Sequence, residues 1–289
     1  MVLMANINTD LANLDVGFAS LGVDTNEMSD FSELKKLVKD INHNSYSADD
    51  LHCKKILLIN VIVESLNQKL KILNEIAESF EDVDNDYRIV GITLKDKPVF
   101  EEVSDKINLL KKLIIEPRFN ILVSDLVKEI KTYLNDLKDR VNKLSDYLSQ
   151  ISEIKNKYHN ADISPESIPP YKELITYTEF YKTYITNKMS TLDESYLQSL
   201  TILMDKKIAS LENRFSIYNT YRSNLFQLFE KCKEHGIDIN STEEAGILTL
   251  YLNSLKTIIK NTGEKDQIQD IMRLFSTNNF QKEEKKPTI

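Results

Sequence analysis

Apolar residues recur every three or four positions along most of this chain, a period typical of amphipathic α-helices. The pattern is longest over residues 47–80, 118–158 and 192–235. In the second of these stretches the apolar residues form a single stripe, and Lys, Asp and Asn occupy the positions between them. The stripe comprises Leu126, Ile130, Tyr133, Leu137, Val141, Leu144, Leu148 and Ile151. The last two stretches predict two helices of ~40 residues, each rising about 60 Å.

Shorter periodic segments predict helices over residues 30–42, 98–116, 171–189, 241–260 and 264–275. Several ends carry capping residues. Gly236 ends the second long helix as a C′ glycine, and Ser241 to Glu244 form a capping box. Ser164, Pro165 and Glu166 predict a short helical turn.

Few residues in this chain favour tight turns, since only 6 Gly and 6 Pro occur in 289 residues. Sheet proteins need many such turns, whereas long helices need almost none. Residues 87–97 alternate around Gly91 like a strand, but no partner strand is evident, so we expect an extended loop. The predicted fold is therefore all-α, as an elongated helical bundle, spectrin-like or coiled-coil-containing.

The predicted organisation has two helical lobes. No internal repeat is evident at periods of about 20 to 50 residues. The Pro-rich connection separates the lobes and holds three of the 6 prolines. The expected order is a partly ordered N-terminal arm (1–29), lobe 1 (30–158), the connection (159–170), lobe 2 (171–275) and a disordered tail (276–289).

The charge balance argues against two classes of partner. The net charge is −8 and the pI about 5.2, with no strongly basic segment. Nucleic acid and anionic lipid both attract basic faces, so binding through bulk charge is not expected. A membrane-curving helical dimer is disfavoured for the same reason.

The two cysteines and the N-terminus indicate a cytoplasmic or nuclear protein with reduced thiols. Cys53 and Cys232 lie far apart in sequence, and the first residues lack the pattern of a signal peptide. The longest apolar run, residues 56–63, is far shorter than the roughly 20 residues of a membrane span.

No motif for catalysis or cofactor binding is found. The glycines are scattered singly, which excludes the Gly-rich nucleotide fingerprints. Cys232 and His235 share a helix face, and His52 with Cys53 would complete a zinc set, but neighbouring residues on a helix point about 100° apart. We therefore expect no metal, no cofactor and no enzymatic activity.

The helix over 171–189 carries a tyrosine-rich face formed by Tyr177, Tyr181 and Tyr184. Such a face is usually a core with its hydroxyls at the rim. The other interpretation is a partner-binding surface, because tyrosine is enriched at binding hot spots.

These features predict a non-catalytic scaffold or adaptor that binds other proteins in a larger assembly, with homo-oligomers formed through the long helices as an option. Cytoskeletal, chromosome-segregation and membrane-trafficking assemblies all use such parts. The alternative is a helical regulator that binds a small molecule or an enzyme between its helices. A concave apolar pocket would favour that alternative.

Overall fold

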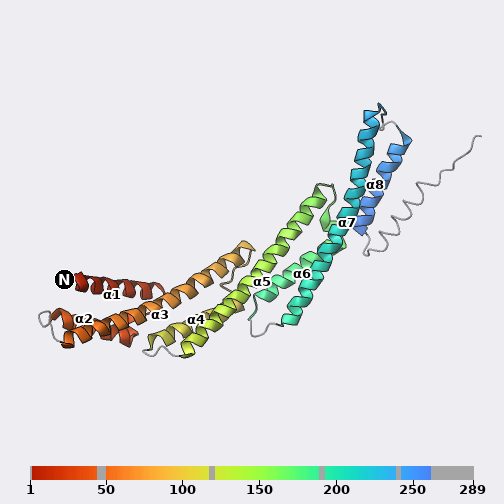
Figure 1. Ribbon diagram of the computed structural model, residues 1–289. Helices are drawn as coiled ribbons and strands as arrows, with labels where there is room; N and C mark the ends of the chain where they lie inside the picture. The colour runs from red at the N-terminus through yellow and green to blue at the C-terminus, as the bar shows by residue number, and fades with distance from the viewer. Residues whose placement is uncertain (1, 44–49, 117–120, 189–192, 239–241, 262–289) are drawn as a thin grey trace, which may run out of the picture. The chain divides into compact units, whose positions relative to one another are not determined.

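The computed structural model describes residues 2–43, 50–116, 121–188, 193–238 and 242–261. Every regular element in these residues is helical and none is a strand, which confirms the predicted all-α class (Figure 1). The α-helices are α1 (Val2–Ser20), α2 (Ser29–His43), α3 (Asp50–Ile89), α4 (Pro98–Ile115), α5 (Ile121–His159), α6 (Pro169–Ile185), α7 (Glu194–Glu234) and α8 (Glu243–Asn261).

Three helices, and not two, reach the length predicted for the long ones. α3, α5 and α7 have 40, 39 and 41 residues. Each is followed by a short helix, and α4, α6 and α8 have 18, 17 and 19 residues. The described chain is therefore a series of long and short helices in alternation, preceded by α1 and α2.

α3 continues beyond Phe80, where the prediction ended it. The acidic run was interpreted as a solvated helix end, but Val83 and Tyr87 within and after it are buried. They continue the apolar stripe from Phe80 in steps of three and four, while none of the acids of the run is buried. Residues 87–97, which alternate like a strand, are thus divided between the end of α3 and a loop. Ile92 and Leu94 of this loop are buried.

The N-terminal stretch forms a regular helix that packs on α3. Leu14 and Phe18 of α1 are buried. At Gly17 the two helices approach so closely that an added Cβ would lie 2.7 Å from a methyl group of Leu70. α1 and α2 are joined through η1 (Thr25–Glu27), whose N-cap Asp24 accepts a hydrogen bond from the Asn26 amide.

The chain divides into two compact units. Unit 1 comprises Met1–Lys143 and Ile185–Leu192, and unit 2 comprises Leu144–Tyr184 and Asp193–Ile289. The division falls inside α5 and not in the segment 159–170. That segment is packed: Ile163 and Ile168 are fully buried, and residues between them form the predicted short helical turn, η2 (Pro165–Ser167).

Each unit contains a buried cationic side chain that forms hydrogen bonds to another segment. In unit 1, Lys69 is 1% exposed, and its ammonium donates to Asp30 at 2.8 Å and to the Glu116 carbonyl at 3.2 Å. In unit 2, the Arg214 side chain is 2% exposed, and it donates to the Ile259 carbonyl at 2.9 Å. Both links join segments distant in sequence, so they define how the helices of each unit pack.

Four helices end in the same turn. One residue with positive φ ends each of α1, α3, α5 and α7; these are Gly22, Gly91, Asp162 and Gly236. The amide of the next residue donates to the carbonyl five positions back, as in Ile92 to Tyr87 at 2.9 Å and Ile163 to Tyr158 at 3.0 Å. This is the Schellman hydrogen-bond pattern.

The four turns reveal an internal repeat. The positive-φ residues recur at intervals of about 70 residues, longer than the periods of about 20 to 50 residues at which no repeat is evident. An aromatic residue lies four positions before three of them, namely Phe18, Tyr87 and Tyr158, and Cys232 takes this position in the last. The helix pairs α3–α4, α5–α6 and α7–α8 are thus three copies of one unit of secondary structure.

Some expectations concern residues outside those described. They are Ser241 in the capping box, the helix over 264–275 and the tail 276–289. α8 begins with a cap from the neighbouring residue, because the Ala245 amide donates to the Thr242 hydroxyl at 3.3 Å.

Candidate functional site

The end of the next short helix covers each of the first two turns. At the α1–α2 turn, a Cβ on Gly22 would lie 3.6 Å from the ammonium of Lys111, near the end of α4. At the α3–α4 turn, the Tyr87 hydroxyl donates to the Ile185 carbonyl at 3.4 Å, and the Val99 amide donates to the Thr186 carbonyl at 3.2 Å. Both carbonyls lie at the end of α6, in the part that belongs to unit 1.

The third turn, between α5 and α6, is covered by α7 and the end of α8. The Tyr158 hydroxyl donates to the Leu211 carbonyl at 2.7 Å, and its ring lies 5.2 Å from that of Phe215. Arg214 interacts with Tyr158 and bonds to Ile259 on α8. The turn and the end of α8 are thereby linked through one buried guanidinium.

Burial determines the electrostatics of this third turn. It raises the pKa of the Tyr158 phenol, an effect that the Arg214 charge partly offsets, so the hydroxyl stays protonated and donates. Burial also lowers the pKa of Arg214, but a guanidinium remains charged throughout the accessible range. The cluster therefore links the turn to α8 structurally, and neither Tyr158 nor Arg214 changes its protonation state near pH 7.

The fourth turn, between α7 and α8, has the same backbone but no such cover. The Ile237 amide donates to the Cys232 carbonyl at 2.9 Å, as in the other turns. Nevertheless Ile237 is 52% exposed, whereas Ile163 at the same position of the third turn is 0% exposed. None of the described residues between Tyr218 and the end of this turn is buried.

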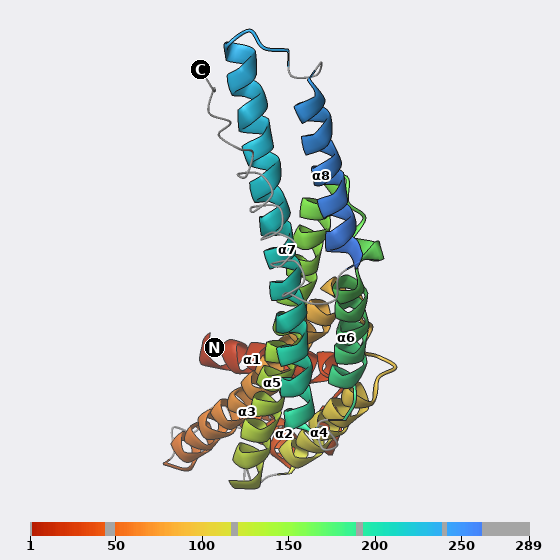
Figure 2. The same cartoon turned by 90° about the vertical axis from the view of Figure 1, so that its right-hand side faces the viewer.

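α7 and α8 lie side by side as an antiparallel hairpin beyond Tyr218 (Figures 1 and 2). The side of α8 that faces α7 carries a regular apolar stripe with steps of three and four. It comprises Ala245, Leu248, Leu252, Leu255 and Ile259. Ala245, Leu255 and Ile259 are buried, so this stripe accounts for the packing of α8 within the unit.

A second apolar stripe lies on the outer side of α8. Ile247, Leu250 and Tyr251 follow the i, i+3, i+4 spacing of one helix face and are 41%, 65% and 39% exposed. No charged residue occurs between Ala245 and Leu255. A solvated helix face normally carries charge, and a helix that is apolar on both sides is normally buried. We call Ile247, Leu250 and Tyr251 the outer stripe, and it is the candidate functional site.

Among the described residues of unit 1, the first half of α3 offers a comparable surface. Leu57, Leu58 and Val61 are exposed there, and Leu57 and Val61 share a face four residues apart. Lys54, Lys55 and Glu64 flank this group, so it is an apolar group within a charged helix.

The structure places the three predicted tyrosines of α6 in different surroundings. Tyr181 is 2% exposed and packs edge-on against Tyr147 at 6.3 Å. Tyr184 is half-buried, its ring packs at a tilt against that of Tyr196 with the centroids 4.7 Å apart, and its hydroxyl accepts a hydrogen bond from the Asp193 amide. Tyr177 is half-buried as well. Only Tyr177 and Tyr184 present surface to a partner, and their role in binding stays a prediction.

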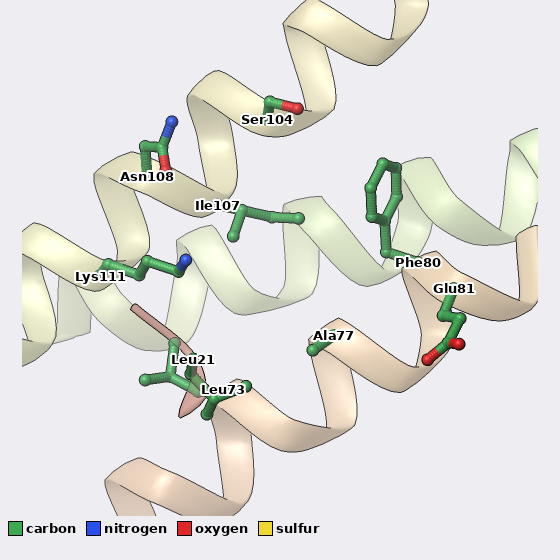
Figure 3. A pocket seen from close by; sticks show the side chains of 9 residues that line it. All are labelled: Leu21, Leu73, Ala77, Phe80, Glu81, Ser104, Ile107, Asn108 and Lys111. Atoms are coloured by element: carbon green, nitrogen blue, oxygen red, sulfur yellow. The ribbon is translucent and has the colours of Figure 1, made fainter. Parts of the chain in front are cut away.

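One pocket of 280 Å³ lies in unit 1, between the end of α1, α3 and α4 (Figure 3). Apolar side chains form most of its wall, with Glu81, Asn108 and Lys111 among the polar ones. The apolar lining residues are Leu21, Leu73, Ala77, Phe80 and Ile107. Its volume is below the roughly 300–1,000 Å³ typical of ligand sites.

Metal-binding residues do not gather in the part of the chain that the structure describes, where no group of three or more His, Cys, Asp or Glu side chains could hold a metal ion. Cys53 and Cys232 are free thiols. The His235 ring nitrogen lies 2.8 Å from the Lys231 carbonyl. Among the described helices none is long and apolar enough to span a bilayer.

The chain was compared with family models, with curated proteins and with solved structures, and no match was found. The sequence analysis did not predict the outer stripe. The signal for it is the uncharged run of residues 245–255, in which a second apolar stripe lies beside the first.

Proposed function

We propose that this chain is a non-catalytic scaffold that binds other proteins through the exposed end of its last helix pair. The observation that carries this proposal is the outer stripe of α8. Three apolar side chains on one face, without a charge among eleven successive residues, mark a surface suited to a helix of a partner.

The repeat supports the same function. In the preceding turns the chain's own later helices cover the equivalent positions, so the helix pair is a unit that associates with further helices. Tyr177 and Tyr184 on α6 offer a second contact surface in this proposal. A cytoplasmic or nuclear location with reduced thiols fits the two free cysteines.

Affinity capture with matched variants tests this function. The full chain is used as bait in three forms: native, Ile247→Asp with Tyr251→Asp, and Leu57→Asp with Val61→Asp. Each double variant places two carboxylates on one helix face, four residues apart. We expect the α8 variant to lose the proteins that the native chain retains, because a buried carboxylate in an apolar interface is costly.

The α3 variant is the control for added charge and for nonspecific adhesion. It should retain the native set of proteins. The same captured set with all three baits would contradict the proposal, since binding would then be independent of the outer stripe.

The pocket in unit 1 favours a second candidate function, a regulator that binds a small apolar molecule with a polar group. The apolar wall and the polar residues Lys111 and Asn108 suit such a ligand. Native mass spectrometry of the purified chain tests it, with Ala77→Phe to fill the space. A small molecule bound to the native chain and absent from the variant supports this function, and its equal presence in both contradicts it.

A further inference from the structure

The pocket of unit 1 is an elongated space between two antiparallel helices. Its lining residues all belong to unit 1. α3 contributes residues within 73–81 and α4 residues within 104–111, in each case at the three- and four-residue steps of one helix face. Lys111 and Leu21 lie at one end of the pocket, and Phe80 and Glu81 lie at the other (Figure 3). Nine residues of helix span about 12 Å, so the space suits a narrow molecule.

The wall of the pocket is apolar and only partly covered. Leu21, Phe80 and Ile107 line it and are half-buried. Ala77 is the small residue at the middle of the α3 side, so no large side chain of α3 occupies that position. The Phe80 ring is held against Phe100, with the centroids 5.4 Å apart. Because apolar surface is unfavourable in water, an apolar body that covers this wall would bind by the hydrophobic effect.

The volume of the pocket limits the size of that body. An apolar cavity of about 150 Å³ holds one benzene molecule. The pocket has 280 Å³, nearly twice as much. It therefore holds roughly ten to twelve non-hydrogen atoms, by proportion to benzene.

Lys111 places a positive charge at one end of the apolar wall. The side chain is half-buried, and none of the described residues forms a hydrogen bond or an ion pair with its ammonium. The ammonium would lie 3.6 Å from a Cβ on Gly22, in the turn that ends α1. The dipole of α1 favours a cation at this C-terminal end. The charge is thus held beside the pocket without a carboxylate to balance it.

The acidic residue of the lining is exposed and distant from Lys111. Glu81 lies at the opposite end of the pocket (Figure 3), where water surrounds its carboxylate. A solvated charge contributes little to an ion pair, so the pocket favours an anion over a cation. One ammonium balances one negative charge. Phosphate groups carry more charge and are typically held by several donors.

We propose that the pocket binds a small monocarboxylic acid with a narrow apolar body of about ten carbons, its carboxylate at Lys111 and its body along Ala77 and Ile107. At neutral pH such an acid is ionised and a lysine is protonated, so the two charges attract. This inference rests on the second candidate function and names its ligand class. The scaffold function through the outer stripe does not depend on it.

Calorimetric titration of the full chain tests the charge of the ligand with three probes of equal length, namely decanoate, decanol and decylamine. Decanoate should bind at least about tenfold more tightly than decylamine, because one attracts the Lys111 ammonium and the other is repelled. Decanol should lie between them, since it has the same body without the charge.

Lys111→Gln tests the contact between the ammonium and the carboxylate. It should weaken decanoate about tenfold and leave decanol unchanged, because it removes the charge and keeps most of the side chain. Lys112→Gln is the matched control. Lys112 is the next residue of α4, it is exposed and it is not part of the lining, so its substitution should change neither probe.

Ala77→Phe tests the place of binding. The larger side chain should fill the space and abolish the binding of decanoate and of decanol alike. Circular dichroism of the variant verifies that it keeps the native helix content. Unchanged decanoate binding to this variant would show that the acid binds elsewhere on the chain and would overturn the proposal.

The remaining outcomes separate the ligand class from the pocket function. Equal affinities for decanoate and decylamine, or no effect of Lys111→Gln, reject an acid as the ligand. If Ala77→Phe still abolishes binding in that case, a small-molecule pocket stands and the acid class alone is rejected. Absence of decanoate binding to the native chain also rejects the acid, and native mass spectrometry then decides on the pocket function by itself.

Discussion

The α5–α6 turn and the α7–α8 turn have the same backbone conformation, but the first is buried and the second is exposed. Both use a residue of positive φ and the same pair of backbone hydrogen bonds. At the first, Tyr158 and Ile163 are buried and Tyr158 packs against α7, whereas Cys232 is half-buried and Ile237 is 52% exposed at the second. The local sequence therefore determines the conformation of the turn, and packing by later helices determines whether its residues are buried or exposed.

The residue four positions before the positive-φ residue should show the largest difference in unfolding free energy between the two turns. Tyr158→Ala is expected to lower the free energy of unfolding of unit 2 by about 3–5 kcal/mol, because it leaves a cavity in a packed core. Cys232→Ala, at the same position of the fourth turn, should cost less than about 1 kcal/mol. Urea unfolding followed by circular dichroism measures both. Equal losses would mean that the fourth turn is covered after all.

The link between the third turn and α8 should come next. Arg214→Met is expected to cost about 1.5–3 kcal/mol, the range for hydrogen bonds to charged groups, and to increase hydrogen exchange at the end of α8. Arg222→Met is the matched control, since Arg222 lies on the same helix but is exposed. If the two variants behave alike, the contact between Arg214 and Ile259 does not hold α8.

Backbone strain should be the same at covered and uncovered turns. Gly91 and Gly236 have φ of 80° and 73°, and an added Cβ would meet no atom within 4 Å at either position. Gly91→Ala and Gly236→Ala are each expected to cost about 1–2 kcal/mol, the penalty for a Cβ in the left-handed region. Thermal unfolding compares them. A much larger loss at Gly91 would show that cover contributes to the turn itself.

The smallest effect is expected at Ile237. Ile237→Ala should change the free energy of unfolding by about 0.5 kcal/mol or less, as at most surface positions. Ile163→Ala at the covered turn is the reference, with an expected loss of about 2–5 kcal/mol. A substantial loss at Ile237 in the monomer would contradict its exposure.

The fold class and most helix ends could be predicted from the sequence. Period and capping residues are local signals, and Gly236 and Pro98 stand where the pattern placed a helix end and a helix start. The predicted end of α3 at Phe80 was wrong, because an acidic run can be either a frayed helix end or the solvent side of a helix that continues. Only tertiary packing on Val83 and Tyr87 decides between the two.

The repeat escaped detection for a physical reason. The turn depends on one positive-φ position and one apolar pair, so few residues are constrained in each copy. Asp162 replaces glycine in the third turn, and Cys232 replaces the aromatic residue in the fourth. The periodic signal is therefore limited to the turn itself, which recurs at about the length of a helix pair.

The candidate site was the least predictable part. Periodicity identifies an apolar face but not which faces find cover, so Tyr181 and Tyr177 looked equivalent although Tyr181 is almost fully buried. The outer stripe lies in a helix whose residues 245–255 carry no charge on any side. Its exposure follows from the arrangement of α7 and α8 together, which no local pattern contains.

Hydrogen exchange of the full chain tests the central claim most directly, namely that the outer face of α8 is exposed and available to a partner. We expect the amides of α8 to exchange faster than those of α4 and α6, and faster than the amides around Tyr87 and Tyr158. Protection of α8 equal to that of α4 and α6 would contradict the account.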